Sequence, residues 1–436
     1  MNIARLILRM NAKQFREILH LGLGRAILYA HDHDMRQYRD VILDACLHCY
    51  SYDVQMEGTR ADYMYELVGR LPDKAFYCDA VLNALAGSGD DNDAVQRFRF
   101  ALRLSRDGHE RAKRMMRESY NPGPSRGELI GVNFLDMDGI QGLLFVAEKM
   151  GAVLLAKPGE SDIGWIISRS KEASGEQATW DALRDAGRKS PNIEAYRLAC
   201  EAGEAASHRK DLIRKEIPAM SYAELLDRAP ANKPYLLWKW GEQASDQELE
   251  LAARGLLESE EPKEQLRHLR IFSRRLFPLR PDTLITLAEG ADDRLIGLNA
   301  MRALAHVSDP AVRALAFRIV KSDVSWRGDA ISLLTKNFKP GDHETVLSWF
   351  EAAEDYDVQH SFAIDLREFW RQHPADKTEV RMLKSLYENG PCSQCREFAL
   401  ERLIELDALT EQMRTECVYD ANDDIRSLVL KPRSNS

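Results

Sequence analysis

The stretch DDRLIGLNAMRALAHVSDPAVRALAFRIVKSDVSWRGDAISLL, residues 292–334, decides the fold class because it encodes three short helices in succession. Asp309 stands at an N-cap position and Pro310 at the first helical position, where a missing N–H leaves no hydrogen bond unmade. The apolar stripe that follows has helical spacing and comprises Val312, Leu315, Ala316 and Ile319. Each helix has only about three turns, too few for stability alone in water, so the helices must pack on their neighbours.

A basic residue followed three positions later by a small apolar residue recurs along the second half of the chain. The pairs are Arg313–Ala316, Arg327–Ala330, His360–Ala363, Arg396–Ala399 and Arg426–Val429. Counted from Ala300, the small residues recur at steps of 30, 33, 36 and 30 residues, and only Arg313–Ala316 falls between steps. A loose period in the thirties is typical of stacked helical pairs. We expect Arg313 to reach a capping carboxylate such as Asp323.

Residues 309–316, DPAVRALA, resemble the D-P-x-V-R-x-x-A signature of short HEAT-like repeats in the HEAT and armadillo superfamily. The resemblance covers residues 281–430 and fades in the first half, where helices continue without the signature. It implies an α-solenoid of stacked antiparallel helix pairs, with a more irregular helical array in the N-terminal half. Such motifs specify architecture and say little about activity.

Strand-like alternation is confined to residues 153–156, so we predict an all-α chain. Two Pro-rich breaks, NPGPS at 121–125 and RAPANKP at 228–234, mark soft domain boundaries. They predict an N-terminal helical bundle over 1–120, a middle helical region over 121–234 and a HEAT-like array over 235–430. Residues 431–436 are expected to form a disordered tail.

Composition places the chain among folded proteins, with 44% hydrophobic and 30% charged residues. A net charge of −9 argues against a general nucleic-acid or membrane coat but leaves room for a local basic face. Seven cysteines in 436 residues do not form a disulfide framework. No apolar run is long enough for a signal or membrane segment. A cytoplasmic protein without a membrane partner is expected.

Two Cys-x-x-Cys pairs, Cys46–Cys49 and Cys392–Cys395, have the spacing of zinc or redox motifs, but 343 residues separate them. The first lies on the apolar face of a helix, where Cys acts as a small hydrophobe. The second follows Gly390-Pro391 at a helix N-terminus, a position that lowers a thiol pKa. We favour structural cysteines, with a redox or metal role as the alternative, and predict no metal site and no cofactor.

Two other short motifs favour structural roles. The HDHD run at 31–34 places consecutive side chains in different directions, so it fits a helix terminus better than a metal site. The GLG run at 22–24 lacks the third glycine and the preceding strand of a dinucleotide-binding loop. Close helix packing is the better explanation of its glycines.

A polar loop over residues 52–60 is a candidate site because loops carry function more often than cores do. Its candidate residues are Asp53, Gln55, Glu57 and Arg60. A salt-bridged turn that fixes two helices explains the same residues equally well.

Two basic clusters could bind an anionic partner, since phosphate contacts come mostly from Arg and Lys. The first comprises Arg97, Arg99, Arg103, Arg106, Arg111, Lys113, Arg114 and Arg117, and the second comprises Arg267, Arg270, Arg274 and Arg275. The alternative is a solvated face whose charges pair with the many carboxylates of the chain.

The HEAT-like resemblance also brings in the alkylpurine DNA glycosylases, which imply a Trp followed four residues later by Asp. The nearest pairs here are Trp326–Asp329, Trp180–Asp185 and Trp238–Glu242, and none has that form. No Ser–His–Asp order, P-loop or His-Glu-x-x-His motif is present. We therefore expect a non-catalytic scaffold or adaptor that binds a protein partner along its concave surface. The alternative is a nucleic-acid-binding protein, including a glycosylase-type enzyme. The oligomeric state stays open.

Overall fold

The computed structural model describes residues 10–87, 90–122, 127–157, 163–230, 232–290, 293–353, 356–374 and 377–430, apart from the side chains of Ile213, Val324 and Tyr356. Within these residues the chain contains 27 α-helices and no strand, which confirms the predicted all-α class. The strand-like residues 153–156 form the last turn of a helix. No helix in the described ranges has both the length and the apolar character needed to cross a membrane. The predicted tail, residues 431–436, lies outside them.

The chain divides into two compact units, and the first is discontinuous in sequence. Unit 1 comprises Met1–His208, Cys392–Gln394 and Leu409–Ser436, and unit 2 comprises Arg209–Pro391 and Cys395–Ala408. Unit 1 therefore holds both the first and the last described helices. The domain boundaries predicted after residues 120 and 234 stay predictions.

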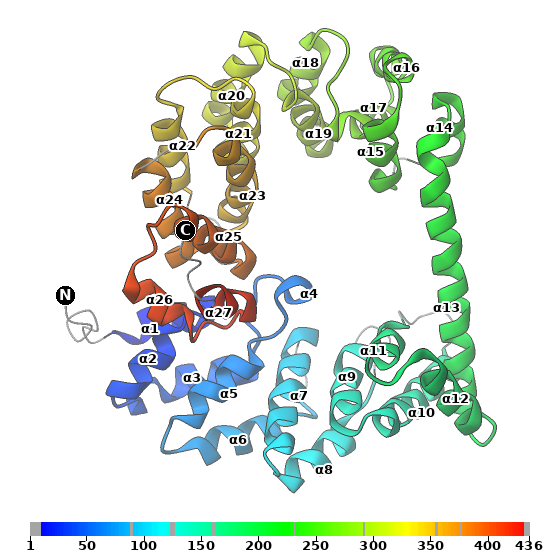
Figure 1. Ribbon diagram of the computed structural model, residues 1–436, viewed down its shortest axis with the longest axis vertical. Coiled ribbons are helices and arrows are strands. Elements are labelled where there is room, and N and C mark those ends of the chain that lie inside the picture. The colour runs from blue at the N-terminus through cyan, green and yellow to red at the C-terminus, as the bar shows by residue number, and fades with distance from the viewer. Residues whose placement is uncertain are drawn as a thin grey trace. The chain divides into compact units, whose positions relative to one another are not determined.

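The helices of unit 1 pack in an alternating order (Figure 1). Their bounds are α1 (Ala12–Leu21), α2 (Arg25–Asp32), α3 (Arg39–Leu47), α4 (Val54–Glu57), α5 (Ala61–Gly69), α6 (Lys74–Asn83), α7 (Asp91–Arg106), α8 (Glu110–Ser119), α9 (Gly127–Asp138), α10 (Ile140–Ala156), α11 (Trp165–Ser174), α12 (Glu176–Gly187), α26 (Glu411–Cys417) and α27 (Asp423–Leu430). Helix α13 (Pro191–Glu216) belongs to unit 1 up to His208 and to unit 2 from Arg209 on. From α1 to α11 each odd-numbered helix packs on the next odd-numbered one. We call this series the odd row of unit 1. Among the even-numbered helices, α6 packs on α8 and α10 packs on α12.

Unit 2 repeats this order. Its helices are α14 (Tyr222–Arg228), α15 (Pro234–Gln243), α16 (Asp246–Glu258), α17 (Pro262–Ile271), α18 (Asp282–Gly290), α19 (Arg294–Leu304), α20 (Pro310–Ser322), α21 (Arg327–Thr335), α22 (Asp342–Glu351), α23 (Tyr356–Gln372), α24 (Lys377–Asn389) and α25 (Ser393–Glu405). From α15 to α23 each odd-numbered helix packs on the next, and α14 packs on α16, α18 on α20 and α22 on α24.

Helix α20 forms as its sequence predicts. The side chain of Asp309 accepts a hydrogen bond from the Ala311 N–H at 2.7 Å, and Pro310 occupies the first turn. The predicted stripe is buried along its whole length, from Val312 to Ile319. These apolar side chains supply the contact that a helix of this length needs for stability.

Arg313 reaches a carboxylate at a helix start, as expected, but that carboxylate is Asp342 and not Asp323. Its guanidinium forms a bidentate ion pair with Asp342 at the start of α22, with N–O distances of 2.6 and 2.7 Å. Asp323 instead accepts the backbone N–H of Ser325 at 2.8 Å, close to its own place in the chain. The arginine thus joins α20 to the N-terminus of α22, where a carboxylate is favoured by the helix dipole.

The C-terminal segment of unit 1 packs against its first two helices. The Ala421 N–H donates to the Gly22 carbonyl at 2.8 Å, and Arg25 Nε lies 2.8 Å from a Glu416 carboxylate oxygen. A Cβ atom placed on Gly24 would lie 2.0 Å from the Glu416 carbonyl oxygen, so a side chain is excluded there. The glycines at 22–24 serve close packing, as expected from the sequence.

Candidate functional site

A hollow of about 1300 Å³ opens on unit 1. Its described lining comes from four members of the odd row in sequence order, α5, α7, α9 and the start of α11. Residues 54–59, around α4, and residues 421–426, around the start of α27, complete it, together with Gln394. Because consecutive odd-row helices pack on one another, their side chains present one continuous surface to this hollow.

The predicted polar loop belongs to this hollow. Asp53 caps α4 by accepting the Gln55 N–H at 2.9 Å. The Glu57 side chain is 2% exposed, and one of its oxygens lies 3.6 Å from the Arg60 guanidinium. Gln55 and Glu57 contribute to the lining, whereas Asp53 and Arg60 hold the turn in place. The structure shows the salt-bridged turn, and two residues of that turn also line the hollow.

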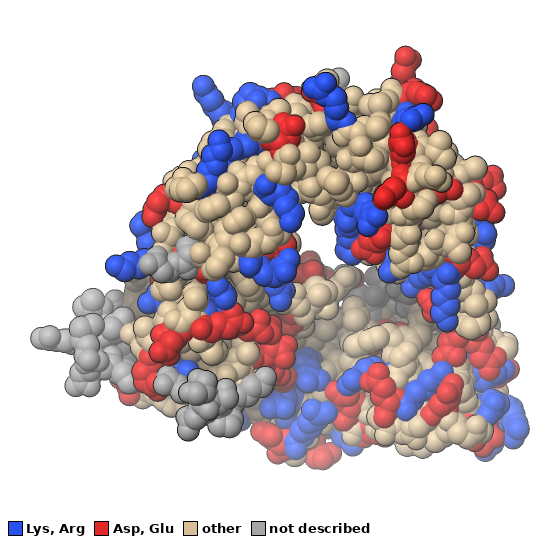
Figure 2. All heavy atoms as spheres, turned by 45° about the horizontal axis from the view of Figure 1, so that its top comes forward, with Lys and Arg blue, Asp and Glu red and all other residues tan. Residues whose placement is uncertain are grey.

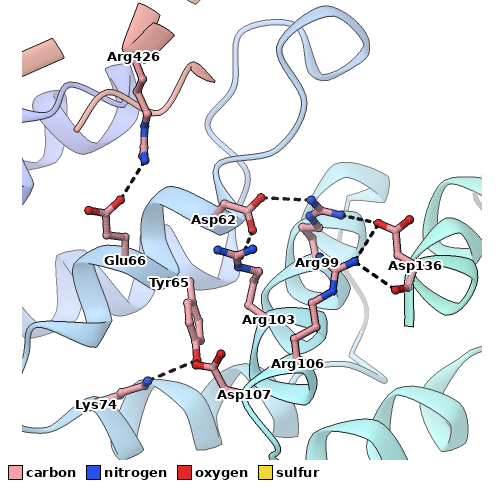
Figure 3. A network of polar contacts seen from close by, with 10 residues as sticks. All are labelled: Asp62, Tyr65, Glu66, Lys74, Arg99, Arg103, Arg106, Asp107, Asp136 and Arg426. Atoms are coloured by element: carbon pink, nitrogen blue, oxygen red, sulfur yellow. Dashed lines mark hydrogen bonds and ion pairs between the residues drawn. The ribbon is translucent and has the colours of Figure 1, made fainter. Parts of the chain in front are cut away.

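Arginines of α7 are bridged by carboxylates of both neighbouring helices in the odd row (Figure 3). Arg99 lies 3.3 Å from Asp62 of α5 and 3.0 Å from Asp136 of α9. Arg103 lies 3.3 Å from Asp62, and Arg106 lies 3.6 Å from Asp136. Arg99 and Arg103 reach the hollow, but they reach it already paired.

The rest of the first basic cluster is also paired or buried. Arg111 lies 2.5 Å from Asp79, Arg114 lies 3.8 Å from Glu118, and both Lys113 and Arg117 contact Asp138. Arg97 is buried, and desolvation lowers its pKa. Figure 2 shows basic and acidic side chains interspersed over the face in view. Paired charges attract phosphates less than free ones, so the solvated-face alternative gains support.

The second basic cluster lies in unit 2 and is engaged in the same way. Arg267 donates to the Leu226 carbonyl, and burial lowers the pKa of Arg270. The Arg274 guanidinium covers the ring of Trp238 with its Cζ 3.6 Å from the ring centroid. It also lies 3.2 Å from Glu242. Arg274 therefore contacts both Trp238 and Glu242, the pair whose spacing is nearest to that of the glycosylases.

Negative charge predominates in the lining of the hollow. Its described carboxylates are those of Glu57, Asp62, Glu66, Glu128, Asp423 and Asp424, and its described guanidinium groups are those of Arg99, Arg103 and Arg426. The formal charge of these residues is −3. Glu66 of α5 forms two ion pairs. It lies 3.1 Å from Arg426 of α27 and 2.8 Å from Arg70, four residues further along the chain.

Glu128 fixes the rim of the hollow. Its buried carboxylate accepts backbone N–H groups of Gly164 and Trp165 at 2.9 and 2.7 Å and the Tyr196 hydroxyl at 2.5 Å. These bonds anchor the N-terminus of α11, where the helix dipole favours a carboxylate. They hold Trp165 at the lining with 48% of its surface exposed. Glu128 is not among the sequence-based candidates, because α9 also contains two aspartates and an asparagine and no local pattern distinguishes Glu128 from them.

Three buried oxygens on the lining accept no hydrogen bond from the described residues. Oδ1 of Asp62 faces Arg103 in an ion pair of 3.3 Å, and the two others have no charged partner so close. One is Oδ1 of Asn133, whose side chain donates through Nδ2 to the Ile130 carbonyl at 2.9 Å. The other is Oε2 of Glu57, which has only the 3.6 Å ion pair to Arg60. Buried acceptors are almost always satisfied in folded proteins, so an unsatisfied one needs an explanation. Asn133 was also missed from the sequence.

Two carboxyl groups with raised pKa values, those of Asp329 on α21 and Asp365 on α23, lie in unit 2. Burial, and then the charge of Asp329, raise the pKa of Asp365 to about 8, while Arg302 opposes the shift. Burial also raises the pKa of Asp329. The nearby Trp326 ring is covered by Arg294 at 4.3 Å. Sequence analysis gave no signal for Asp365, because packing of α21 on α23 creates its environment.

The seven cysteines form no disulfide, and burial raises the pKa of Cys46, as expected for a structural thiol. The second pair differs, because Cys395 Sγ lies 3.3 Å from Nδ1 of His360. This contact lies within unit 2 and brings together one thiol and one imidazole. Zinc binds thiolate and imidazole ligands, and its structural sites use four of them.

Comparisons with protein-family models, with curated proteins and with solved structures return no match for this chain. The resemblance to HEAT-like repeats therefore stays a prediction.

Proposed function

We propose that the protein is a helical-repeat scaffold that binds a protein partner on the odd-row face of unit 1. The architecture supports this proposal, because in each unit the odd-numbered helices pack successively. Such an order is typical of α-solenoids, in which each repeat contacts mainly its neighbours and long binding surfaces result. The DPAVRALA resemblance in α20 points in the same direction.

The observation that carries the proposal is the apolar surface gathered at the hollow. Met56, Leu129 and Trp165 belong to its lining and are 61%, 42% and 48% exposed. Large exposed apolar side chains grouped around a concave site are typical of a binding surface. Met and Trp are enriched at the centres of protein interfaces, and a polar rim like that of the surrounding ion pairs is typical there.

A protein partner fits this surface better than a nucleic acid does. The arginines that suggested phosphate binding are held by Asp62 and Asp136, and the lining carries excess negative charge. Phosphate binding requires basic groups that release counterions from the nucleic acid, and a negative surface opposes it. The nucleic-acid alternative, with its glycosylase form, has weaker support.

Affinity capture with matched variants tests the proposal. We expect the immobilised full chain to retain a protein partner in near-stoichiometric amounts from nuclease-treated native lysate. The double variant Leu129→Ala/Trp165→Ala removes apolar surface at the hollow and should lose that partner. The double variant Leu155→Ala/Leu198→Ala removes comparably exposed side chains of unit 1 outside the lining and should retain it.

Two results would contradict the proposal. One is the absence of any stoichiometric protein partner. The other is equal retention by the two double variants, which would place the contact elsewhere. Capture of the protein from untreated lysate but not from nuclease-treated lysate would favour the nucleic-acid alternative instead.

A further inference from the structure

The negative charge of the hollow favours a positively charged ligand. Its described residues carry six carboxylates and three guanidinium groups, and the guanidinium groups of Arg99 and Arg103 already face Asp62. Asp423 and Asp424 are exposed at the start of α27, and Asp423 lies 4.0 Å from Arg426. Complementary potentials steer association and reject wrong partners, so this surface favours a cationic ligand over an anionic one.

Two of the three unsatisfied oxygens on the lining favour a ligand that donates hydrogen bonds. Oδ1 of Asn133 and Oε2 of Glu57 are acceptors, and both belong to residues of the lining. The Asn133 residue is 1% exposed, and its Oδ1 belongs to the wall of the hollow without a hydrogen-bond donor. An unpaired buried acceptor destabilises the protein, and a ligand that donates a hydrogen bond to it removes that destabilisation. A ligand with several N–H groups and a positive charge meets both requirements.

Apolar side chains at the same site narrow the choice of cation. Trp165 offers an exposed ring, and Leu129 and Met56 add apolar surface beside it. A guanidinium is planar, carries five N–H donors and stacks on aromatic rings, whereas an ammonium is more strongly hydrated. The volume of about 1300 Å³ exceeds the roughly 300–1,000 Å³ of most small-molecule sites, so it suits a chain segment better than a free small cation.

We infer that the hollow of unit 1 receives an arginine side chain from a basic segment of the protein partner, with Trp165 as its stacking surface and Asn133 and Glu57 as its acceptors. This inference rests on the proposed function and adds the chemistry of the partner. Asp423 and Asp424 supply the surrounding negative charge that draws the basic segment toward the hollow.

Labelled peptides test the inference without knowledge of the partner. The probe is a fluorescein-labelled nonapeptide with three arginines spaced by Gly and Ser, and its matched control carries citrulline at the same three positions. Citrulline keeps the shape of arginine and removes its charge. We expect fluorescence anisotropy with the full chain to show binding of the arginine peptide at least about tenfold tighter than binding of the citrulline peptide, since charge-assisted hydrogen bonds are the stronger class.

Charge-neutral variants connect that preference to the hollow. Glu57→Gln/Asp424→Asn should weaken binding of the arginine peptide at least about threefold and leave the citrulline peptide unchanged. The matched control Glu118→Gln/Asp185→Asn removes two exposed carboxylates of unit 1 outside the lining and should have no effect. Circular dichroism of each variant verifies folding. Trp165→Ala provides a second test, because it lowers arginine affinity without changing any charge.

Equal affinity for the arginine and citrulline peptides would overturn the inference, as would an arginine preference that survives both Glu57→Gln/Asp424→Asn and Trp165→Ala. These failures differ from failure of the proposed function. If a captured partner still requires Leu129 and Trp165 while the peptides show no arginine preference, the proposed function stands and the arginine assignment falls.

Discussion

Replacing Asp365 with Asn should stabilise the protein, and the gain should grow with pH. The pKa of this carboxyl group is raised from 3.8 to about 8, first by burial and then by Asp329. The folded state therefore keeps a proton that the unfolded state has lost between these two values. Stability must fall as pH rises through that window, because the folded state binds more protons. Asparagine has no charge to lose, so the variant escapes this fall.

The size of the effect follows from the shift. A difference of about four pKa units corresponds to an upper limit of about 5–6 kcal/mol, at about 1.4 kcal/mol per unit. Asp365 keeps partial solvent contact, which reduces this value. We expect the stability gap between variant and wild type to widen by about 2–4 kcal/mol from about pH 5 to about pH 8.5. For a unit of this size that equals roughly 5–10 °C in the thermal midpoint.

Thermal unfolding followed by circular dichroism across this pH range measures the gap. Asp323→Asn is the matched control in the same unit. Its pKa is lowered by the backbone N–H of Ser325, so Asp323 contributes stability above its ordinary pKa and loses it as pH falls. Its variant should therefore be the less stable one at neutral pH, with a gap that closes in acid. Parallel pH profiles for wild type and Asp365→Asn would refute the reasoning.

Three further results are expected. Gly24→Ala should destabilise the chain by about 1–3 kcal/mol in chemical unfolding, because its Cβ would lie 2.0 Å from the Glu416 carbonyl oxygen. The control Gly69→Ala has open space at its Cβ and should be neutral or stabilising. Equal effects of the two substitutions would contradict the packing of the C-terminal segment. Arg313→Lys should cost about 1–3 kcal/mol because lysine loses the bidentate pair with Asp342, and an unchanged unfolding midpoint would argue against that pair. Because the α7 arginines are paired, labelled duplex DNA and single-stranded RNA should show no salt-dependent binding in anisotropy titrations, and a steep salt slope would revive the nucleic-acid alternative.

Local signals in the sequence predicted the helices well. The cap at Asp309 and the buried stripe of α20 depend on residues within one helix, and both are confirmed. The candidate loop at 53–60 was also placed by a local signal, and part of it lines the hollow. Glu128 and Asn133 were not distinguished by a local signal, because α9 also contains Asp136 and Asp138.

Contacts distant in sequence were beyond prediction. Asp62 and Arg99 are 37 residues apart, and nothing local distinguishes this pair from the other combinations of 60 basic and 69 acidic residues. The return of the C-terminal segment to Gly24 joins residues 391 positions or more apart. The raised pKa of Asp365 arises from a neighbouring helix. Each of these three features depends on which helices become neighbours. No short motif in a single sequence encodes the choice of neighbouring helices.

Site-specific photocrosslinking in lysate tests the binding surface most directly. A photoreactive amino acid placed at position 129 lies on the lining of the hollow, and the same residue at position 155 lies outside it with similar exposure. We predict one dominant protein adduct from position 129, with the crosslinked partner peptide containing arginine, and no such adduct from position 155. Adducts of equal yield from both positions, or none from position 129, would contradict the account.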